Sequence, residues 1–256
     1  GFKFLGNFIG TDEWVSAQLR TKFTEHLEPL TTLLQLTDTE VHRNRLQCQL
    51  LLLRWSAAQK ANYWLRTTPP RQVLSAVEAH DRPMCEALTT ILDFDGSSPS
   101  GRAALRQCSL PLHLGGLGIP SARVLSEPAY AGSIASFWHD ITTLVPALSV
   151  DLSRPDLLPH SLEEARQSYE RLTAQREAIL VRRAAKSRLP PLADQNSSPR
   201  FLLPQLRPAA IPSFASLARA PLRKAQQCLA AVCHQQEWEE LFDSLCDDSV
   251  SGRDPV

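Results

Sequence analysis

Two aspartates have a spacing that could suit a divalent metal ion. A calcium-binding EF-hand loop that starts at Asp93 needs a glutamate at its twelfth position, where Ala104 stands, and Asp95 alone does not complete the ligand set. A polymerase or nuclease site needs further carboxylates that the fold gathers around the metal. We therefore interpret the segment that contains Asp93 and Asp95 as a turn that ends a helix.

A second group of potential metal ligands lies near the C-terminal end: Cys228, Cys233, His234 and Cys246. Its spacing, C-x4-C-H-x11-C, matches no standard zinc module closely. The six cysteines are scattered, no CxxC pair occurs, and no secretory signal precedes them, so we expect free buried thiols. We predict that this chain binds no metal ion and no cofactor.

Imidazoles beside carboxylates are fragments of a general base, and the sequence has His80–Asp81, His139–Asp140 and a lone His113. No serine or cysteine nucleophile lies in a recognisable elbow. Adjacent His and Asp side chains on a helix are expected to point apart. We interpret each of these histidines as a surface or half-buried residue, and we predict no catalytic residue in the chain.

A glycine-rich loop, LPLHLGGLGIPS, spans residues 110–121. The dinucleotide-binding fingerprint needs a third glycine where Ser121 stands, and the phosphate loop needs a Gly-Lys-Ser/Thr end that is absent. We interpret Gly115, Gly116 and Gly118 as a structural loop, in which glycine supplies positive φ and close packing.

Candidate nucleic-acid contacts are aromatic or basic. In the segment Asn62–Arg66, Tyr63 and Trp64 could stack on bases and Arg66 could pair with phosphate; alternatively Trp64 and Leu65 are core and Arg66 neutralises a helix end. Nine basic residues lie between positions 182 and 224 with one acid, and seven acids follow between 237 and 254. The candidate contacts are Arg66, Arg182, Arg183, Lys186, Arg188, Arg223 and Lys224. Alternatively, these cations solvate the C-terminal arm and pair with acidic residues.

Composition and charge set limits on the whole chain. Hydrophobic residues make up 43% of it, which is enough to bury a core, and the formal net charge is zero. The longest purely aliphatic run, Leu50 to Leu53, is far shorter than the roughly 20 residues of a membrane span, and the start lacks a signal peptide. We expect an intracellular protein, nuclear or cytoplasmic, with no membrane contact. The chain opens on Gly1 rather than methionine, and we expect the true N-terminus to lie upstream.

Apolar periodicity and prolines predict a mainly α-helical fold. Residues 2–9 favour a strand or half-hairpin, and a helix then runs from Thr11 or Asp12 to about Leu34. A longer helix is predicted from Asp38 to Pro69, and we expect it to be central because Leu50 to Leu53 is apolar all round. Further helices are expected over about 71–92, 99–108, 121–144, 161–186 and 213–246.

These elements predict a helical bundle over 1–145 with a short N-terminal β segment, a linker over 146–160, and an extended helical C-terminal arm over 161–256. Within the arm, six prolines between 189 and 212 are too dense for regular structure.

Three stretches in the same order resemble the reverse transcriptases of non-LTR retrotransposons, of the type found in oomycetes and other protists. The first stretch is FKFLGNFIG (2–10), which is similar to the segment after the palm of these proteins. The second is QLLLLRWSAAQKANYWLRTTPP (49–70), which is similar to their connecting helix. The third is LPLHLGGLGIPSARVLSEPAYAGSIASFWHD (110–140), which is similar to the region beyond their thumb. The resemblance implies that Phe4, Leu5 and Gly6 form a primer-side turn, that 12–69 is the thumb, and that the rest of 1–145 is its connector.

The resemblance also implies what the chain does not contain. The catalytic aspartates of that family, which hold magnesium, lie upstream of the first stretch. We expect a fragment that contacts template–primer, weakly binds RNA–DNA hybrid or duplex, partners an upstream palm domain, and is inactive alone. The alternative is a non-enzymatic helical module, derived from a retroelement, that binds protein or nucleic acid.

Overall fold

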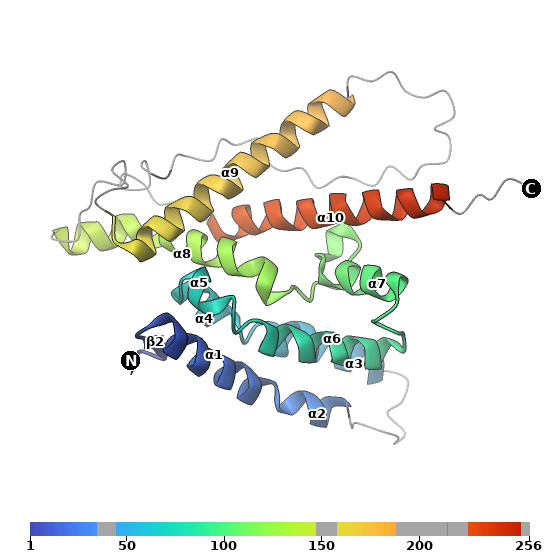
Figure 1. Cartoon of the computed structure of the whole chain (residues 1–256), viewed down its shortest axis with the longest axis horizontal. Coiled ribbons are helices and arrows are strands. Elements are labelled where there is room, and N and C mark those ends of the chain that lie inside the picture. Colours follow the sequence, from blue (N-terminus) through green and yellow to red (C-terminus); the bar gives the residue numbers. More distant parts are fainter. Residues whose placement is uncertain (35–44, 147–157, 188–213, 215–224, 252–256) are drawn as a thin grey trace, which may run out of the picture.

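A computed structural model describes residues 1–34, 45–146, 158–187, 214 and 225–251 of the chain. The fold is mainly α-helical, with one two-stranded antiparallel sheet at the N-terminus, as predicted. Helix α8 (Ala122–Leu144) lies in the middle, between helices of the N-terminal half on one side and two long C-terminal helices on the other (Figure 1). None of the helices in the described part is long and apolar enough to cross a membrane.

The first nine residues form a hairpin of β1 (Phe2–Phe4) and β2 (Asn7–Ile9), paired with Phe4 opposite Asn7. Leu5 and Gly6 form the turn, with φ of 46° and 87°. Two consecutive positive φ angles are typical of the two-residue turns that match the twist of a hairpin. Phe8 is the hairpin's one buried side chain, and its ring packs edge-on against Trp14.

The helix predicted from Asp12 to Leu34 is two helices, α1 (Asp12–Leu27) and α2 (Pro29–Leu34). Proline lacks the amide hydrogen that would continue the helical ladder, and its ring clashes with the preceding turn, so the helix breaks just before Pro29. The apolar stripe of α1 is buried as its spacing predicts, at Val15, Leu19, Phe23 and Leu27.

The single long helix predicted from Asp38 to Pro69 is wrong in the part that the structure describes. Residues 35–44 lie outside the described part, and the remainder is divided into α3 (Arg45–Leu52), the π-helix η2 (Leu53–Ala57) and α4 (Asn62–Thr67). In η2, the amide of Ala58 donates to the carbonyl of Leu53 at 2.9 Å, which widens the turn and ends the α-helical register.

The predicted all-round burial of Leu50 to Leu53 is also wrong. Leu53 is fully buried against α6 (Glu78–Leu92), whereas Leu52 is 48% exposed and Leu51 is exposed too. Consecutive residues on a helix point about 100° apart, so a helix that packs on one side cannot bury four in a row.

The helix predicted over 71–92 is also divided, into α5 (Pro70–Val73) and α6, which ends at Asp93 in the left-handed conformation. The next helix, α7 (Pro99–Ser109), begins where the side chain of Ser98 accepts a hydrogen bond from the amide of Gly101. Helices α7 and α8 begin and end within about one residue of their predicted bounds, because serine N-caps and prolines mark their ends.

The two C-terminal helices, α9 (His160–Ser187) and α10 (Ala225–Ser251), pack along α8. Their shared core contains Tyr130, Ala131 and Ala135 of α8, Leu162, Ala165, Tyr169 and Leu172 of α9, Phe214, and Ala225 and Leu229 of α10. Arg71 of α5 pairs with both Asp12 of α1 and Glu164 of α9, at 2.9 and 3.1 Å. The described part of α9 therefore also contacts the N-terminal half.

The predicted division into 1–145, 146–160 and 161–256 stays a prediction. The proline-rich segment 189–212 lies outside the described residues, as does the predicted start of the last helix at 213.

Candidate nucleic-acid interface

The hairpin turn lies against α4, so two segments that the sequence suggested separately are in contact. The Tyr63 hydroxyl donates to the carbonyl of Leu5, and the indole Nε1 of Trp64 donates to the carbonyl of Gly6 at 3.4 Å. On the next residue, the Asn7 side-chain amide donates to the carbonyl of Thr67 at 3.0 Å. These bonds between residues about sixty positions apart hold the turn in place on the helix.

The outer face of this unit is aromatic and basic. Phe4 is 57% exposed and Leu5 is 82% exposed, and Phe2 and Tyr63 are also exposed. Arg66 is exposed three residues after Tyr63, a spacing that places both on the same side of α4. We call this group the hairpin surface and define it as Phe2, Lys3, Phe4, Leu5, Tyr63 and Arg66.

Trp64 and Leu65 are core residues, which is the second of the two interpretations that the sequence left open. Trp64 packs edge-on against the rings of Phe23 and His26, and both Trp64 and Leu65 are buried. Tyr63, rather than Trp64, is therefore the aromatic side chain of α4 that remains accessible to a nucleic-acid base.

The hairpin surface carries stacking and cationic groups, and no carboxylate or imidazole is among the residues that define it. Exposed aromatic rings stack on bases of any sequence, and Lys3 and Arg66 can contact phosphate oxygens. The predicted primer-side turn contains Leu5 and Gly6. Their carbonyls already accept hydrogen bonds from Tyr63 and Trp64, so the backbone of these two residues fixes the turn on α4.

The other predicted nucleic-acid contacts cannot be placed relative to this surface. Helix α9 contains Arg182, Arg183 and Lys186, but the side chains of these three residues lie outside the described part of the structure. All atoms of three further residues also lie outside it: Arg188, Arg223 and Lys224. Their role stays a prediction.

The glycine loop between α7 and α8 has the geometry that requires glycine. Gly115 and Gly118 have φ of 81° and 68°. A side chain on Gly116 would lie 2.0 Å from the carbonyl oxygen of Leu110. The amide of Gly118 donates to that same carbonyl at 2.8 Å, which closes the loop.

The His80–Asp81 pair differs from its predicted form. His80 is 1% exposed rather than half-buried, and its Nδ1 lies 3.0 Å from Oδ1 of Asp81, so the two side chains do not point apart. The remaining bonds of Asp81 are to the start of α8: it accepts from the hydroxyl of Ser121 at 2.6 Å and from the amides of Ala122 and Arg123 at 2.8 and 3.1 Å. Asp81 is thus a structural anion at a helix N-terminus, where the dipole favours negative charge.

These bonds determine how Asp81 titrates. Burial disfavours its charge, but the hydrogen bonds from His80, from Ser121 and from the two backbone amides outweigh burial and hold the pKa of Asp81 below its usual value. A carboxyl whose pKa is lower in the folded state adds stability above its unfolded pKa of about 3.9, and that stability is lost as pH falls through the folded pKa.

We expect Asp81→Asn to lower the free energy of unfolding by about 1–3 kcal/mol near pH 7, because an amide cannot accept all four bonds. The difference from wild type should shrink as pH falls below the unfolded pKa of about 3.9 and toward the lower folded pKa, at which the wild-type carboxyl itself becomes protonated. Urea unfolding of both proteins at pH 7 and pH 3 measures it. Asp93→Asn is the control, since Asp93 is exposed and asparagine tolerates the left-handed conformation. A difference for Asp81→Asn that does not change with pH would contradict the assignment.

The predicted turn at Asp93 and Asp95 is present, and Asp95 Oδ1 accepts from the amide and hydroxyl of Ser97 at 2.9 and 2.6 Å. In the part of the chain that the structure describes, no three potential ligands lie close enough to hold a metal ion. Cys228 is exposed and Cys233 half-buried, and the side chain of Cys246 is not among those described.

A cleft elsewhere on the molecule was missed by the sequence reasoning. It lies between η2, the glycine loop and α10, and Arg54, Trp55, His113 and His234 line it. Arg54 and Trp55 flank a leucine run that suggested only core, and His234 was considered only as a metal ligand. No signal in the sequence relates residues this far apart.

Comparison of the chain with family models, with curated proteins and with solved structures found no match.

Proposed function

We propose that this chain is the thumb and connector segment of a reverse-transcriptase-like protein, and that its hairpin surface contacts the template–primer duplex. The contact between the hairpin turn and α4 is the observation that supports this proposal best. It joins the stretch 2–10 to the stretch 49–70, two of the three on which the resemblance rests, in a single exposed unit.

The exposure of the hairpin supports a role in binding. A hairpin of nine residues that buries only Phe8 exposes Phe2, Phe4 and Leu5 together. Contiguous exposed apolar side chains are typical of interaction sites rather than of free surface. The same unit exposes Lys3 on β1 and Arg66 on α4, so it offers both stacking and phosphate-binding groups, which suit nucleic acid.

The proposal assigns binding and positioning to this chain, and no chemical step. The resemblance implies magnesium, but the described carboxylates do not fit a magnesium site: Asp81 is used by the start of α8 and Asp95 by its own turn. Holding a duplex in the correct orientation is itself a large part of catalysis by polymerases, because it removes the entropy cost of alignment.

We expect the full chain to bind a fluorescently labelled RNA–DNA hybrid with a dissociation constant of roughly 10⁻⁶ to 10⁻⁴ M, the range of non-specific contacts. Arg66→Glu should weaken binding about tenfold, through loss of a phosphate contact and repulsion, and Phe4→Ala by at least about fivefold, through loss of stacking. Fluorescence anisotropy at several salt concentrations measures both effects.

Two matched variants control for charge and for aromatic exposure. Arg82→Glu makes the same charge change on an exposed face of α6, and Phe242→Ala removes an exposed ring from α10. Both should bind the hybrid as wild type does. The proposal is wrong if the wild-type chain does not bind at low salt, or if the controls weaken binding as much as Arg66→Glu and Phe4→Ala.

A non-enzymatic interaction module is the second candidate function. The exposed leucines of α3, which are Leu46, Leu51 and Leu52, favour it because exposed apolar side chains suit a protein partner. The hybrid titration separates the two candidates, since a module that binds only protein would not bind the hybrid at any salt concentration.

A further inference from the structure

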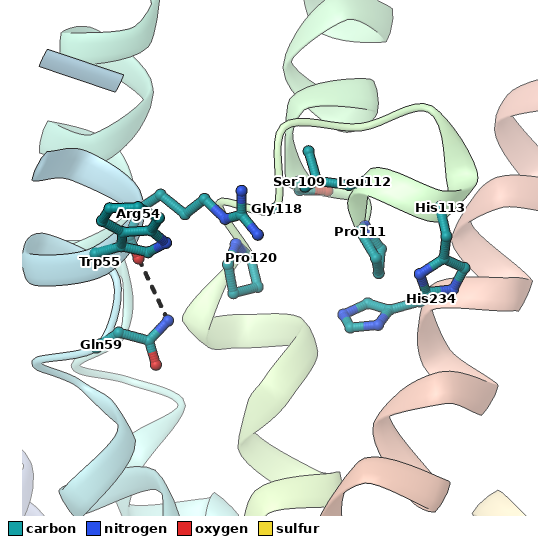
Figure 2. Close-up of a pocket in the computed structure, with 10 residues that line it drawn as sticks. All are labelled: Arg54, Trp55, Gln59, Ser109, Pro111, Leu112, His113, Gly118, Pro120 and His234. Atoms are coloured by element: carbon teal, nitrogen blue, oxygen red, sulfur yellow. Dashed lines mark hydrogen bonds between the residues drawn. The ribbon is translucent and has the colours of Figure 1, made fainter. Parts of the chain in front are cut away.

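A cleft of about 530 Å³ opens between η2, the glycine loop and α10, on residues that the hairpin surface does not include. Figure 2 shows Arg54 and Trp55 on one side of it and the rings of His113 and His234 on the other, with Pro111 and Pro120 between them. This volume lies within the range of pockets that hold small ligands.

The π-helix determines where Arg54 and Trp55 point. A short π turn closes with a hydrogen bond five residues apart, so it holds one more residue than an α-helical turn. Such turns are frequent at functional sites. Here the turn positions the Arg54 side chain over Gly118, so close that a side chain on Gly118 would lie 3.0 Å from Nε of Arg54. Arg54 forms no ion pair with any carboxylate of the described residues, so its charge is available to a ligand.

The opposite wall contains two imidazoles, those of His113 and His234. Nε2 of His234 is buried and has no hydrogen-bond partner among the described residues. Burial, and to a smaller extent the neighbouring His113, lowers the pKa of His234 to about 4, so the ring is neutral near pH 7 and free to form a hydrogen bond to a ligand. An unpaired polar group of this kind is unfavourable in a folded protein unless a ligand or solvent satisfies it.

The chemistry of the lining indicates the ligand class. Arg54 is a permanent cation and no carboxylate is among the described residues that line the cleft, so this lining favours an anion. Trp55 is 67% exposed at the rim, where its flat ring can stack on another planar ring. An anionic group attached to a planar ring satisfies both features, whereas a simple anion would leave the indole unused.

We propose that this cleft binds a nucleotide unit, with its phosphate between Arg54 and the two imidazoles and its base stacked on Trp55. The nucleotide can be free or part of a single strand, since both present the same chemistry. The site does not depend on the hairpin surface, and either can be correct without the other.

The test is calorimetric titration of the full chain with adenosine 5′-monophosphate, inorganic phosphate, adenosine, and a short single-stranded oligonucleotide with and without a 5′-phosphate. We expect the monophosphate to bind more tightly than phosphate or adenosine alone. Arg54→Ala should weaken that binding at least about tenfold, since a charge-assisted hydrogen bond is lost, and Arg54→Lys should recover part of it. Trp55→Ala should weaken it by at least about fivefold.

Arg20→Ala on α1 and Phe242→Ala on α10 lie outside the cleft and should bind as wild type does. Far-UV circular dichroism and thermal unfolding show whether the cleft variants fold, and both substituted side chains reach the surface. If only an oligonucleotide binds, and Arg54→Ala and Trp55→Ala weaken it, the ligand is a unit of a strand and the proposal stands.

Three outcomes overturn the proposal. The first is no binding of any probe at low salt, and the second is binding that Arg54→Ala and Trp55→Ala leave unchanged. The third is equal binding of phosphate and the monophosphate, because the cleft would then recognise charge without the ring.

Discussion

Replacing Leu53 with alanine lowers the free energy of unfolding by about 2–5 kcal/mol, whereas the same change at the adjacent Leu52 lowers it by no more than about 1 kcal/mol. Leu53 is fully buried and packs with Ala57 of η2 and with Met84, Ala87, Leu88 and Ile91 of α6. Truncation removes the buried methyl groups and leaves a cavity that the surrounding helices fill only in part. Leu52 is 48% exposed, so truncation there leaves no cavity.

Urea unfolding of the two variants, followed by circular dichroism, measures the difference. The pair is closely matched, because the residues are neighbours of one type and only their burial differs. Equal losses would show that the leucine run is buried all round, as the sequence suggested, and that the π-helix does not divide it. A loss under about 0.5 kcal/mol at Leu53 would show that this helix is not part of the core.

Enlarging Gly132 separates α10 from α8, and the loss of stability grows with the size of the new side chain. A side chain at Gly132 would lie 2.5 Å from Cα and 2.6 Å from the amide nitrogen of Gln226. Backbone cannot rotate away as a flexible side chain can, so α10 itself must move. Overpacking of this kind costs about 1–3 kcal/mol, and alanine regains about 0.5–1 kcal/mol because glycine is unfavourable in a helix. We therefore expect the free energy of unfolding to fall only slightly in Gly132→Ala and by about 3 kcal/mol in Gly132→Leu.

Hydrogen exchange measures where that loss occurs. In Gly132→Leu the amides of α10 should exchange faster, while those of α1 remain as in wild type, because only the α8–α10 contact is disturbed. Arg123→Leu is the control, since Arg123 is exposed on the first turn of α8. If α10 exchanges equally slowly in Gly132→Leu, then it does not pack against α8 at this point.

The sequence by itself determined the elements whose ends have a local cause. Helices α7 and α8 were predicted to within about one residue because Ser98 and Ser121 accept hydrogen bonds from the first free amides and because prolines mark the ends nearby. The buried stripe of α1 was predicted because helical periodicity is a property of neighbouring residues. The three glycines of the loop were recognised because positive φ and close backbone approach exclude other side chains.

Only the tertiary structure decided the features that depend on distant residues. The π turn at Leu53 replaces the α-helical register by a wider one. Packing of Leu53 against α6 favours this turn. Nothing local in the leucine run distinguishes Leu53 from Leu52. His80 is buried against Phe23, and the neighbouring Asp81 bonds to the start of α8, some forty residues later. The hairpin contacts α4, and Arg54 faces His234, only because folding brings these segments together. A single sequence indicates which residues prefer a buried or an extended state. It does not indicate which residues contact one another.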